Sequence, residues 1–261
     1  MTRDAIAFTG LGHAYRRDEW IFRGYHGRLA KGRIMAVLGP NGCGKTTLLR
    51  LLLGIAAPTE GQVTIEGKAA FVPQLFQVGF DYSVLDMVLM GRAAKVALLA
   101  QPSRRDEEAA LAALDRVGMA DFASRPFHHL SGGQRQMVIF ARALVSAPEI
   151  MILDEPSSAL DLRNQAVILE RMAMLAHHDG LSVLFTTHHP HHALSVADDV
   201  LLMLRPDHAV SGPVADILTE DNLRQLYGVP LKLLGFEHEG RPHRTLAPVL
   251  TPEVILERGR S

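Results

Sequence analysis

Three features are missing from this sequence of 261 residues, and each absence narrows its class. Cys43 is the single cysteine, so an internal disulfide is excluded, as expected in a reducing compartment. No run approaches the roughly 20 apolar residues that a membrane-spanning helix needs. The N-terminus leads into an alternating segment rather than the apolar core of a signal peptide. We therefore expect a soluble chain that reaches a membrane only through a partner.

The sequence also lacks an excess of charge of either sign. It holds 27 Lys and Arg against 28 Asp and Glu, for a net charge of -1. Nucleic-acid-binding domains usually carry a basic patch, so no nucleic-acid partner is expected. The 48% of hydrophobic residues is ample for a core, and the length permits one large domain or two small ones.

Short apolar runs alternate with helical patterns along most of the chain. The run Ile34–Leu38 is typical of a buried strand, whereas apolar spacing between 83 and 146 indicates helices. Further short strands are predicted at 5–8, 20–22, 62–67, 69–72, 150–153, 182–185 and 200–204. This order predicts an α/β fold with a mostly parallel sheet and a helical insertion. From Pro230 onwards the sequence has no clear pattern.

A glycine-rich loop lies between the predicted strand 34–38 and a predicted helix that runs from about Lys45 to Leu53. It matches the G-x-x-x-x-G-K-[ST] pattern, in which glycines let N–H groups face phosphate oxygens at a helix N-terminus. Lys45 can reach the β- and γ-phosphates, and the Thr46 hydroxyl can bind Mg²⁺. An ordinary glycine-rich turn would not need that lysine and threonine. The predicted nucleotide-binding residues are Gly39, Pro40, Asn41, Gly42, Cys43, Gly44, Lys45, Thr46 and Thr47.

Two adjacent carboxylates, Asp154 and Glu155, follow the predicted strand 150–153. Ligands of parallel sheets gather at the carboxyl ends of the strands. We therefore expect Asp154 to hold Mg²⁺, directly or through water, and Glu155 to orient the attacking water. One of the acids could instead be a helix N-cap or a surface charge.

The segment Leu130–Gln134, called the signature segment below, precedes a predicted helix. Ser131 and Gln134 fit a capping box, which is a purely structural role. The glycines between them cost about 1 kcal/mol each relative to alanine. Because a simple cap does not need Gly132 and Gly133, we expect them to let an anion approach the helix end.

In this order, the motifs resemble those of ATP-binding cassette (ABC) ATPases over roughly residues 1–230. The motifs are Gly39–Thr46, Gln74, Leu130–Gln134, Asp154-Glu155, Ser158-Ala159-Leu160-Asp161 and His188. The resemblance implies a P-loop (RecA-like) core at 1–82 and 147–230, with an N-terminal antiparallel β portion. It further implies a helical subdomain at 83–146, and leaves 231–261 as a C-terminal extension of unknown role.

The resemblance also assigns roles to single residues. Gln74 would sense Mg²⁺ and the γ-phosphate, His188 would contact the γ-phosphate, and Asp161 would cross a dimer interface. Two copies would pack head to tail, so that Ser131, Gly132, Gly133 and Gln134 of one close over ATP held by the other. Tyr15 would stack on adenine, or be an ordinary tyrosine on a strand face. The implied catalytic residues are Lys45, Gln74, Glu155 and His188.

A narrower resemblance links 83–92, 159–165 and 222–229 to ATPases of importers for iron–siderophore, haem, cobalamin or molybdate. It implies ATP and Mg²⁺ as ligands, integral membrane permease subunits as partners, and a substrate-binding protein as an indirect one. The location implied is cytoplasmic, on the inner face of the membrane. Phe76, Phe80 and Tyr82 would face the permease or pack inside the helical subdomain. The alternative function is a non-transport ABC ATPase acting on nucleic acid or ribosomes.

The densest histidine cluster is His188-His189-Pro190-His191-His192. His188 and His192 have the i, i+4 spacing of a metal-binding helix, but Pro190 lies between them and no motif supplies a carboxylate. We expect His188 to serve ATP and the other histidines to be solvated. A metal site is the alternative.

Overall fold

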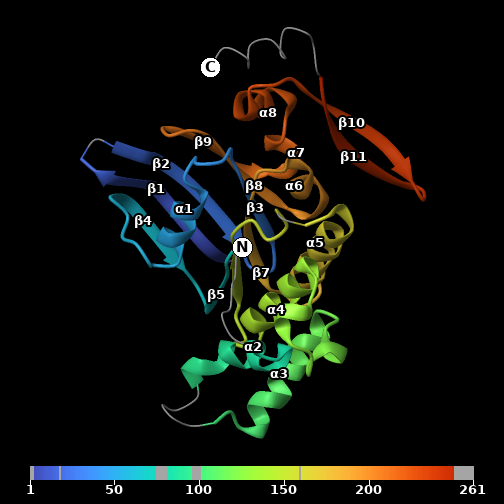
Figure 1. Ribbon diagram of the computed structural model, residues 1–261. Coiled ribbons are helices and arrows are strands. Elements are labelled where there is room, and N and C mark those ends of the chain that lie inside the picture. Colours follow the sequence, from blue (N-terminus) through green and yellow to red (C-terminus); the bar gives the residue numbers. More distant parts are fainter. Residues whose placement is uncertain (1–2, 18, 75–80, 96–100, 159, 250–261) are drawn as a thin grey trace.

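The computed structural model describes residues 3–17, 19–74, 81–95, 101–158 and 160–249 (Figure 1). None of the helices in these ranges is long and apolar enough to cross a membrane. Phe76, Phe80 and Ala159 lie outside the described residues. Tyr82 packs against the hydrophobic core, as the second of the two readings expected.

A three-stranded antiparallel sheet, in the order β2-β1-β4, is built from β1 (Asp4–Arg16), β2 (Glu19–Ala30) and β4 (Glu60–Ile65). The prediction of short strands at 5–8 and 20–22 was wrong, because β1 and β2 have 13 and 12 residues. Gly10 and Gly24 have φ of 58° and 73°, and the β1–β2 pairing shifts register several times. These irregularities conceal the period of two in the sequence.

A six-stranded sheet lies at the centre of the molecule, and its strand order is β5-β6-β7-β3-β8-β9. Its strands are β3 (Ile34–Leu38), β5 (Ala69–Val72), β6 (Ile150–Leu153), β7 (Ser182–Thr187), β8 (Asp199–Arg205) and β9 (His208–Pro213). All neighbours pair in parallel except β8 and β9. The largely parallel sheet is therefore confirmed, and the antiparallel edge strand β9 is an addition to it.

The helices connect these strands and form the insertion. They are α1 (Lys45–Leu52), α2 (Val84–Leu89), α3 (Arg104–Arg116), α4 (Gly132–Leu144), α5 (Leu162–His177), α6 (Pro190–Val196), α7 (Val214–Ile217) and α8 (Glu220–Tyr227). Short 3₁₀ helices span Met90–Lys95, Ala120–Phe122 and Phe127–His129. In Figure 1 the helices α2, α3 and α4 gather on one side of the central sheet.

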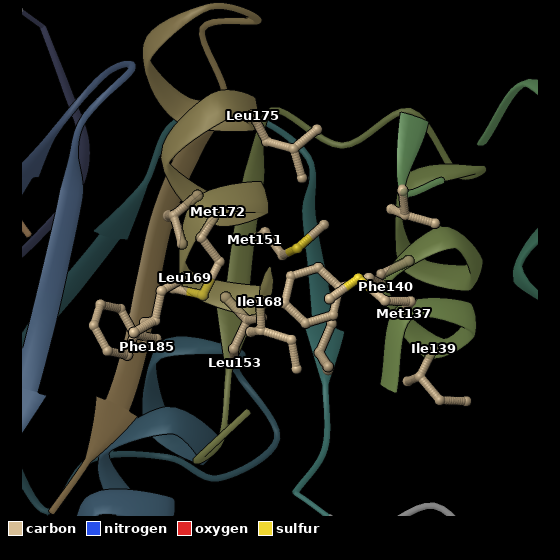
Figure 2. Close-up of a cluster of buried hydrophobic side chains, with 14 of the residues drawn as sticks. Met137, Ile139, Phe140, Met151, Leu153, Ile168, Leu169, Met172, Leu175 and Phe185 are labelled. Carbon is tan, nitrogen blue, oxygen red and sulfur yellow. The ribbon is translucent and has the colours of Figure 1, made fainter. Parts of the chain in front are cut away.

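The two faces of the central sheet belong to two hydrophobic clusters. On β3, Ile34, Ala36 and Leu38 face one cluster, whereas Met35 and Val37 face the other. Figure 2 shows the first cluster, in which side chains of α4 and α5 converge on β6. Phe140 is fully buried there, with 0% of its surface exposed. Because both faces are covered, the polar groups that follow the strands lie at the sheet's carboxyl edge.

An antiparallel hairpin of β10 (Leu231–His238) and β11 (Arg241–Pro248) follows α8 and extends away from the core (Figure 1). Leu231 and Leu246 are buried, while Leu234 and Phe236 are about half exposed. This mixture explains why the sequence after Pro230 has no readable period.

Candidate functional site

The glycine-rich loop turns tightly between β3 and α1. Gly42 and Gly44 have φ of 80° and 102°, in the region that favours glycine. A Cβ on Gly44 would lie 2.6 Å from the side chain of Ile21. The loop encloses the Lys45 side chain, whose Nζ donates to the carbonyls of Gly39 (2.9 Å) and Pro40 (3.1 Å). The loop thus holds an ammonium group at the N-terminus of α1, where a phosphate would also bind.

A buried ion pair joins this loop to the acidic pair. Lys45 Nζ lies 3.0 Å from Glu155 Oε1, and the two side chains are 6% and 10% exposed. The other carboxylate oxygen, Oε2, lies 3.0 Å from His188 Nδ1. Burial raises the pKa of Glu155, but the hydrogen bond and charge of Lys45, together with His188, outweigh it and leave that pKa below its usual value. Glu155 is therefore an ionised carboxylate in the site.

Hydroxyl groups hold the neighbouring carboxylate. Thr46 Oγ1 donates to Asp154 Oδ2 over 2.8 Å, and Thr186 Oγ1 donates to Asp154 Oδ1 over 2.7 Å. The Glu155 N–H donates to the same Thr186 oxygen, at 2.9 Å. Thr186 lies near the end of β7, next to β6, so a neighbouring strand fixes both acids. The sequence reading missed Thr186, although it follows the predicted strand 182–185 and precedes His188.

The backbone at Glu155 is unusual for a residue with a side chain. Its φ is 43°, in the left-handed region that costs a non-glycine residue on the order of 1 kcal/mol or more. Such conformations persist where the surroundings determine them, and they cluster at functional sites. At Glu155, the bonds to Lys45, Thr186 and His188 hold the residue in this conformation.

All of these groups except Thr186 line one cavity of about 720 Å³. Its lining residues are Asn41, Gly42, Gly44, Lys45, Thr46, Thr47, Gln74, Asp154, Glu155, Ser158 and His188. Gln74 Nε2 donates to Ser158 Oγ over 3.1 Å, and Ser158 Oγ donates to the carbonyl of Glu155 over 3.2 Å. All four residues predicted to be catalytic thus meet at a cavity whose walls suit a polyphosphate.

Three of the predicted loop residues, and Tyr15, do not line this cavity. Gly39, Pro40 and Cys43 are not among the residues that line the cavity, and Cys43 Sγ points towards Met203 Sδ, 3.8 Å away. Tyr15 is 61% exposed and its hydroxyl lies 3.1 Å from Thr47 Oγ1. Its ring is accessible beside α1, as a stacking residue requires, but it does not line the cavity either.

The residues present fit Mg²⁺ by their chemistry. The Thr46 hydroxyl and the Asp154 carboxylate lie within hydrogen-bonding distance of each other, and Gln74 lines the same cavity. Hydroxyl, carboxylate and amide oxygens are ligands that this ion prefers. Among the described residues, no group of three or more His, Cys, Asp and Glu side chains could hold a metal ion.

The signature segment lies apart from this cavity. Ser131 caps α4, with Gln134 N donating to its Oγ (3.3 Å) and its own N–H donating to Gln134 Oε1 (3.0 Å), which confirms the capping box. Ser131 and Gly132 are exposed, and none of Ser131, Gly132, Gly133 or Gln134 lines the cavity. The side chains of Ser131 and Gln134 therefore bond to backbone N–H groups of their own first turn.

The close approach expected at the glycine pair exists, but it comes from the same chain. A Cβ on Gly133 would lie 2.4 Å from Asn164 Oδ1, whereas one on Gly132 would meet Leu160 at an ordinary 3.4 Å. Asp161 caps α5, its Oδ1 accepting from Asn164 N over 2.8 Å. The beginnings of α4 and α5 therefore pack directly on each other at Gly133.

The expectation that the histidines other than His188 are solvated was wrong for His192. It is 6% exposed and packs among polar groups of α5 and β7. Burial, followed by the nearby His189, His188 and His191, lowers its pKa to about 4. Its apolar neighbour Ala193 is also buried, so the first turn of α6 turns this histidine inwards.

Comparisons with known proteins agree with this geometry. A family model described as ABC transporter matches residues 22–158. The molybdate import ATP-binding protein MolC of Haemophilus influenzae is 42% identical, over 87% of this chain and 89% of that protein. In solved structures, a chain of an inward-facing ABC transporter assigned to the metal-chelate type is 39% identical. It superimposes with a TM-score of 0.91, over 97% of this chain and 100% of its own.

A further solved structure is dimeric. The bacterial ABC transporter cassette MJ0796 is 26% identical and superimposes with a TM-score of 0.65, over 76% of this chain and 93% of its own. The P-loop fold with its helical insertion, the family match and these likenesses lead to one conclusion. The chain belongs to the ABC transporter family, as an ATP-binding and ATP-hydrolysing subunit associated with a membrane transporter.

Proposed function

We propose that the chain powers import of a metal chelate or oxyanion through separate membrane permease subunits. The observation that supports this most is the cavity in which the phosphate loop, both carboxylates, Gln74 and His188 meet. The relatives' names support the cargo class, because one is a molybdate importer subunit and another belongs to a metal-chelate type transporter. The candidates are iron–siderophore, haem, cobalamin and molybdate, delivered by a substrate-binding protein. The chain would act on the cytoplasmic side of the membrane.

In this proposal the phosphates of ATP lie along the loop Gly39–Thr46. The ammonium group of Lys45 neutralises the β- and γ-phosphates. In the structure it lies 3.0 Å from the Glu155 carboxylate, so a bound phosphate competes with Glu155 for it. Glu155 then orients the attacking water, and His188, which uses Nδ1 towards Glu155, has Nε2 for a phosphate oxygen. Mg²⁺, held by Thr46, Asp154 and Gln74, would add positive charge at the phosphates. Tyr15 offers its exposed ring to adenine.

The proposal includes a head-to-tail dimer of two copies. Its support is the separation of the signature segment from the cavity, since capped and exposed residues can close on ATP held by a second copy. The dimeric cassette MJ0796 shows that such proteins can pair. Asp161, which caps α5 at the Asn164 that contacts Gly133, would then meet the partner copy. We assign 1–230 to the nucleotide-binding domain, with 83–146 as its helical subdomain and 231–261 as an extension.

The test measures Mg²⁺-dependent ATP hydrolysis by the chain alone and by the chain co-purified with membrane permease subunits. Wild type should turn over ATP at a rate that the permease regulates, and Glu155→Gln should abolish it. Glu149→Gln is the matched control, because Glu149 is an exposed acid at the opposite end of the same strand. Turnover that is indifferent to the permease, or that survives in Glu155→Gln, would contradict the proposal. Uptake of each candidate cargo by the reconstituted complex then identifies the substrate.

A further inference from the structure

His192 lies where three segments of the chain meet. Its Nδ1 is 3.2 Å from Ser157 Oγ and 3.1 Å from Thr187 Oγ1, and its Nε2 is 3.4 Å from Gln165 Oε1. Ser157 follows Glu155 by two residues, Thr187 precedes His188, and Gln165 lies in the first turn of α5. A single buried imidazole therefore bridges both catalytic strands and the helix that follows Asp161.

The orientation of the Gln165 amide follows from its other contacts. Its Nε2 donates to the carbonyl of Ser157 over 3.2 Å and to that of Leu160 over 3.1 Å. Carbonyl oxygens only accept, so the NH₂ group must face them and both of its hydrogens are used. The amide oxygen Oε1 is consequently the atom that faces His192.

This orientation fixes the tautomer of His192. Gln165 Oε1 is an acceptor, so His192 Nε2 must carry the hydrogen, and Nδ1 of the neutral ring is left as an acceptor. The hydroxyls of Ser157 and Thr187 are the donors within reach of Nδ1. Thr187 Oγ1 also accepts from His189 N over 3.0 Å, which leaves its hydrogen for the imidazole. Nδ1 has a single lone pair, so the two hydroxyls share it in a three-centre bond, while Nε2 donates to Gln165.

The bonds of Gln165 reach the segment that leads from Glu155 to α5. Ser157 and Leu160 lie on this segment, and Asp161, directly after Leu160, caps α5. Asn164 of the same helix end packs against Gly133 of the signature segment. A chain of contacts thus runs from the end of β7, directly before His188, through His192 and Gln165, to the beginning of α4.

We propose that His192 and Gln165 are positioning residues that set Ser157, Leu160 and Asp161, and with them the beginning of α5, relative to His188 and Glu155. The inference rests on the proposed function, because Asp161 and the signature segment act in turnover only at the interface of two copies. Neither residue touches the cavity, so their loss changes the catalytic step rather than ATP binding. Helix α5 contacts both α6 and β7 (Figure 1), the arrangement that lets these contacts form.

The experiment compares four variants of the full chain in complex with its permease. His192→Phe keeps the ring but removes both nitrogens; His192→Gln replaces the Nε2 donor and His192→Asn replaces the Nδ1 acceptor. His191→Phe is the matched control, because His191 belongs to the same cluster but contacts Leu246 of the C-terminal hairpin. We measure kcat, the KM for ATP and the melting temperature of each variant.

His192→Phe should lower kcat by about tenfold or more while KM stays within about twofold, as expected when reacting groups are misplaced. The Gln and Asn variants should each recover part of the loss, and His191→Phe should match wild type. A wild-type kcat in His192→Phe would overturn the proposal. So would a loss that follows the melting temperature alone, with Gln and Asn no better than Phe. If His192→Phe does not fold, Gln165→Met gives the same test with the same expected and contradicting results.

Amide hydrogen exchange separates this inference from the proposed function. In His192→Phe, peptides covering 160–168 should exchange faster than in wild type, whereas peptides covering 34–53 should be unchanged. This readout needs no ATP turnover, so it decides the positioning role even if wild type fails to hydrolyse ATP. Unchanged exchange in 160–168 would contradict the proposal.

Discussion

The phosphate-loop side of the molecule and the signature segment both place a helix N-terminus at the surface, but they satisfy their polar groups differently. At the loop, Lys45, Glu155 and Asp154 bond to groups from distant segments around one cavity. At the signature segment, Ser131 and Gln134 bond only within their own turn, away from that cavity. On the first side, distant segments of the chain build one cavity. On the second side, a single helix turn forms its own hydrogen bonds and stays at the surface. This contrast is what the head-to-tail dimer proposed above requires, in which each chain contributes one half of an ATP site to its partner.

The buried ion pair gives the largest expected effect on the loop side. Lys45→Met leaves the Glu155 carboxylate buried without its cation, which should cost about 3 kcal/mol of unfolding free energy and abolish turnover. Replacing both partners, in Lys45→Met/Glu155→Leu, should recover stability but not turnover. Urea unfolding and ATPase assays check both.

The control for that pair is an exposed one. Lys31 lies 4.0 Å from Glu66, with side chains 43% and 50% exposed. Lys31→Met should cost less than about 1 kcal/mol and leave turnover unchanged, because water screens such pairs. Equal losses of stability and turnover in Lys45→Met and Lys31→Met would contradict a special role for the buried Lys45–Glu155 pair.

On the signature side, Gly133→Ala separates packing from ATP contact. The new Cβ would overlap Asn164, so we expect a loss of about 2 kcal/mol, as is typical of overpacking. Asn164→Ala in the same chain should restore stability by removing that overlap. If Gly133 also faces ATP of a second copy, turnover should stay low in the stable double variant. Full recovery of turnover would mean that the glycine serves packing alone.

His192, which connects the two sides, makes the unfolding free energy depend on pH. Its pKa is lowered from 6.5 in the unfolded chain to about 4 by burial and by the neighbouring histidines. The unfolded state therefore binds the proton first, and this contribution to stability is present above about pH 6.5 and lost as the pH falls towards 4. Between pH 7 and pH 5 it should lower the unfolding free energy by about 2 kcal/mol.

The comparison of wild type with His192→Gln isolates this dependence, because both chains share all other titrating groups. Urea unfolding at the two pH values should show a steeper loss in wild type. Parallel losses in the two chains would contradict a neutral, buried His192.

The smallest expected difference comes from matched caps. Ser131 and Ser103 both begin helices with a full capping box, but only Ser131 is followed by two glycines. Each serine-to-alanine change should cost about 1 kcal/mol of stability. Only Ser131→Ala should also lower ATP turnover in the complex. A similar decrease in turnover for Ser103→Ala would indicate that Ser131 serves only as a helix cap.

The sequence predicted the loop side well because its determinants are local. Lys45, Asp154 and Glu155 stand in motifs at the ends of apolar strands, and parallel strands bring such ends to one edge. The roles of Thr186, Gln165 and His192 depend on contacts over 27 to 35 residues, such as that from Ser157 to His192, and no local pattern signals them. The two long N-terminal strands were read as short ones because glycine bulges interrupt their period. The C-terminal hairpin escaped prediction because much of it is exposed.

Sedimentation of Glu155→Gln, with and without Mg²⁺ and ATP, tests most directly whether the two sides complete each other between copies. The account predicts a monomer without ATP, a dimer with ATP, and an ATP-bound monomer when Ser131→Arg is added. It also predicts that Ser103→Arg leaves the dimer intact. A Glu155→Gln chain that binds ATP yet stays monomeric, or a dimer that ignores Ser131→Arg, would contradict it.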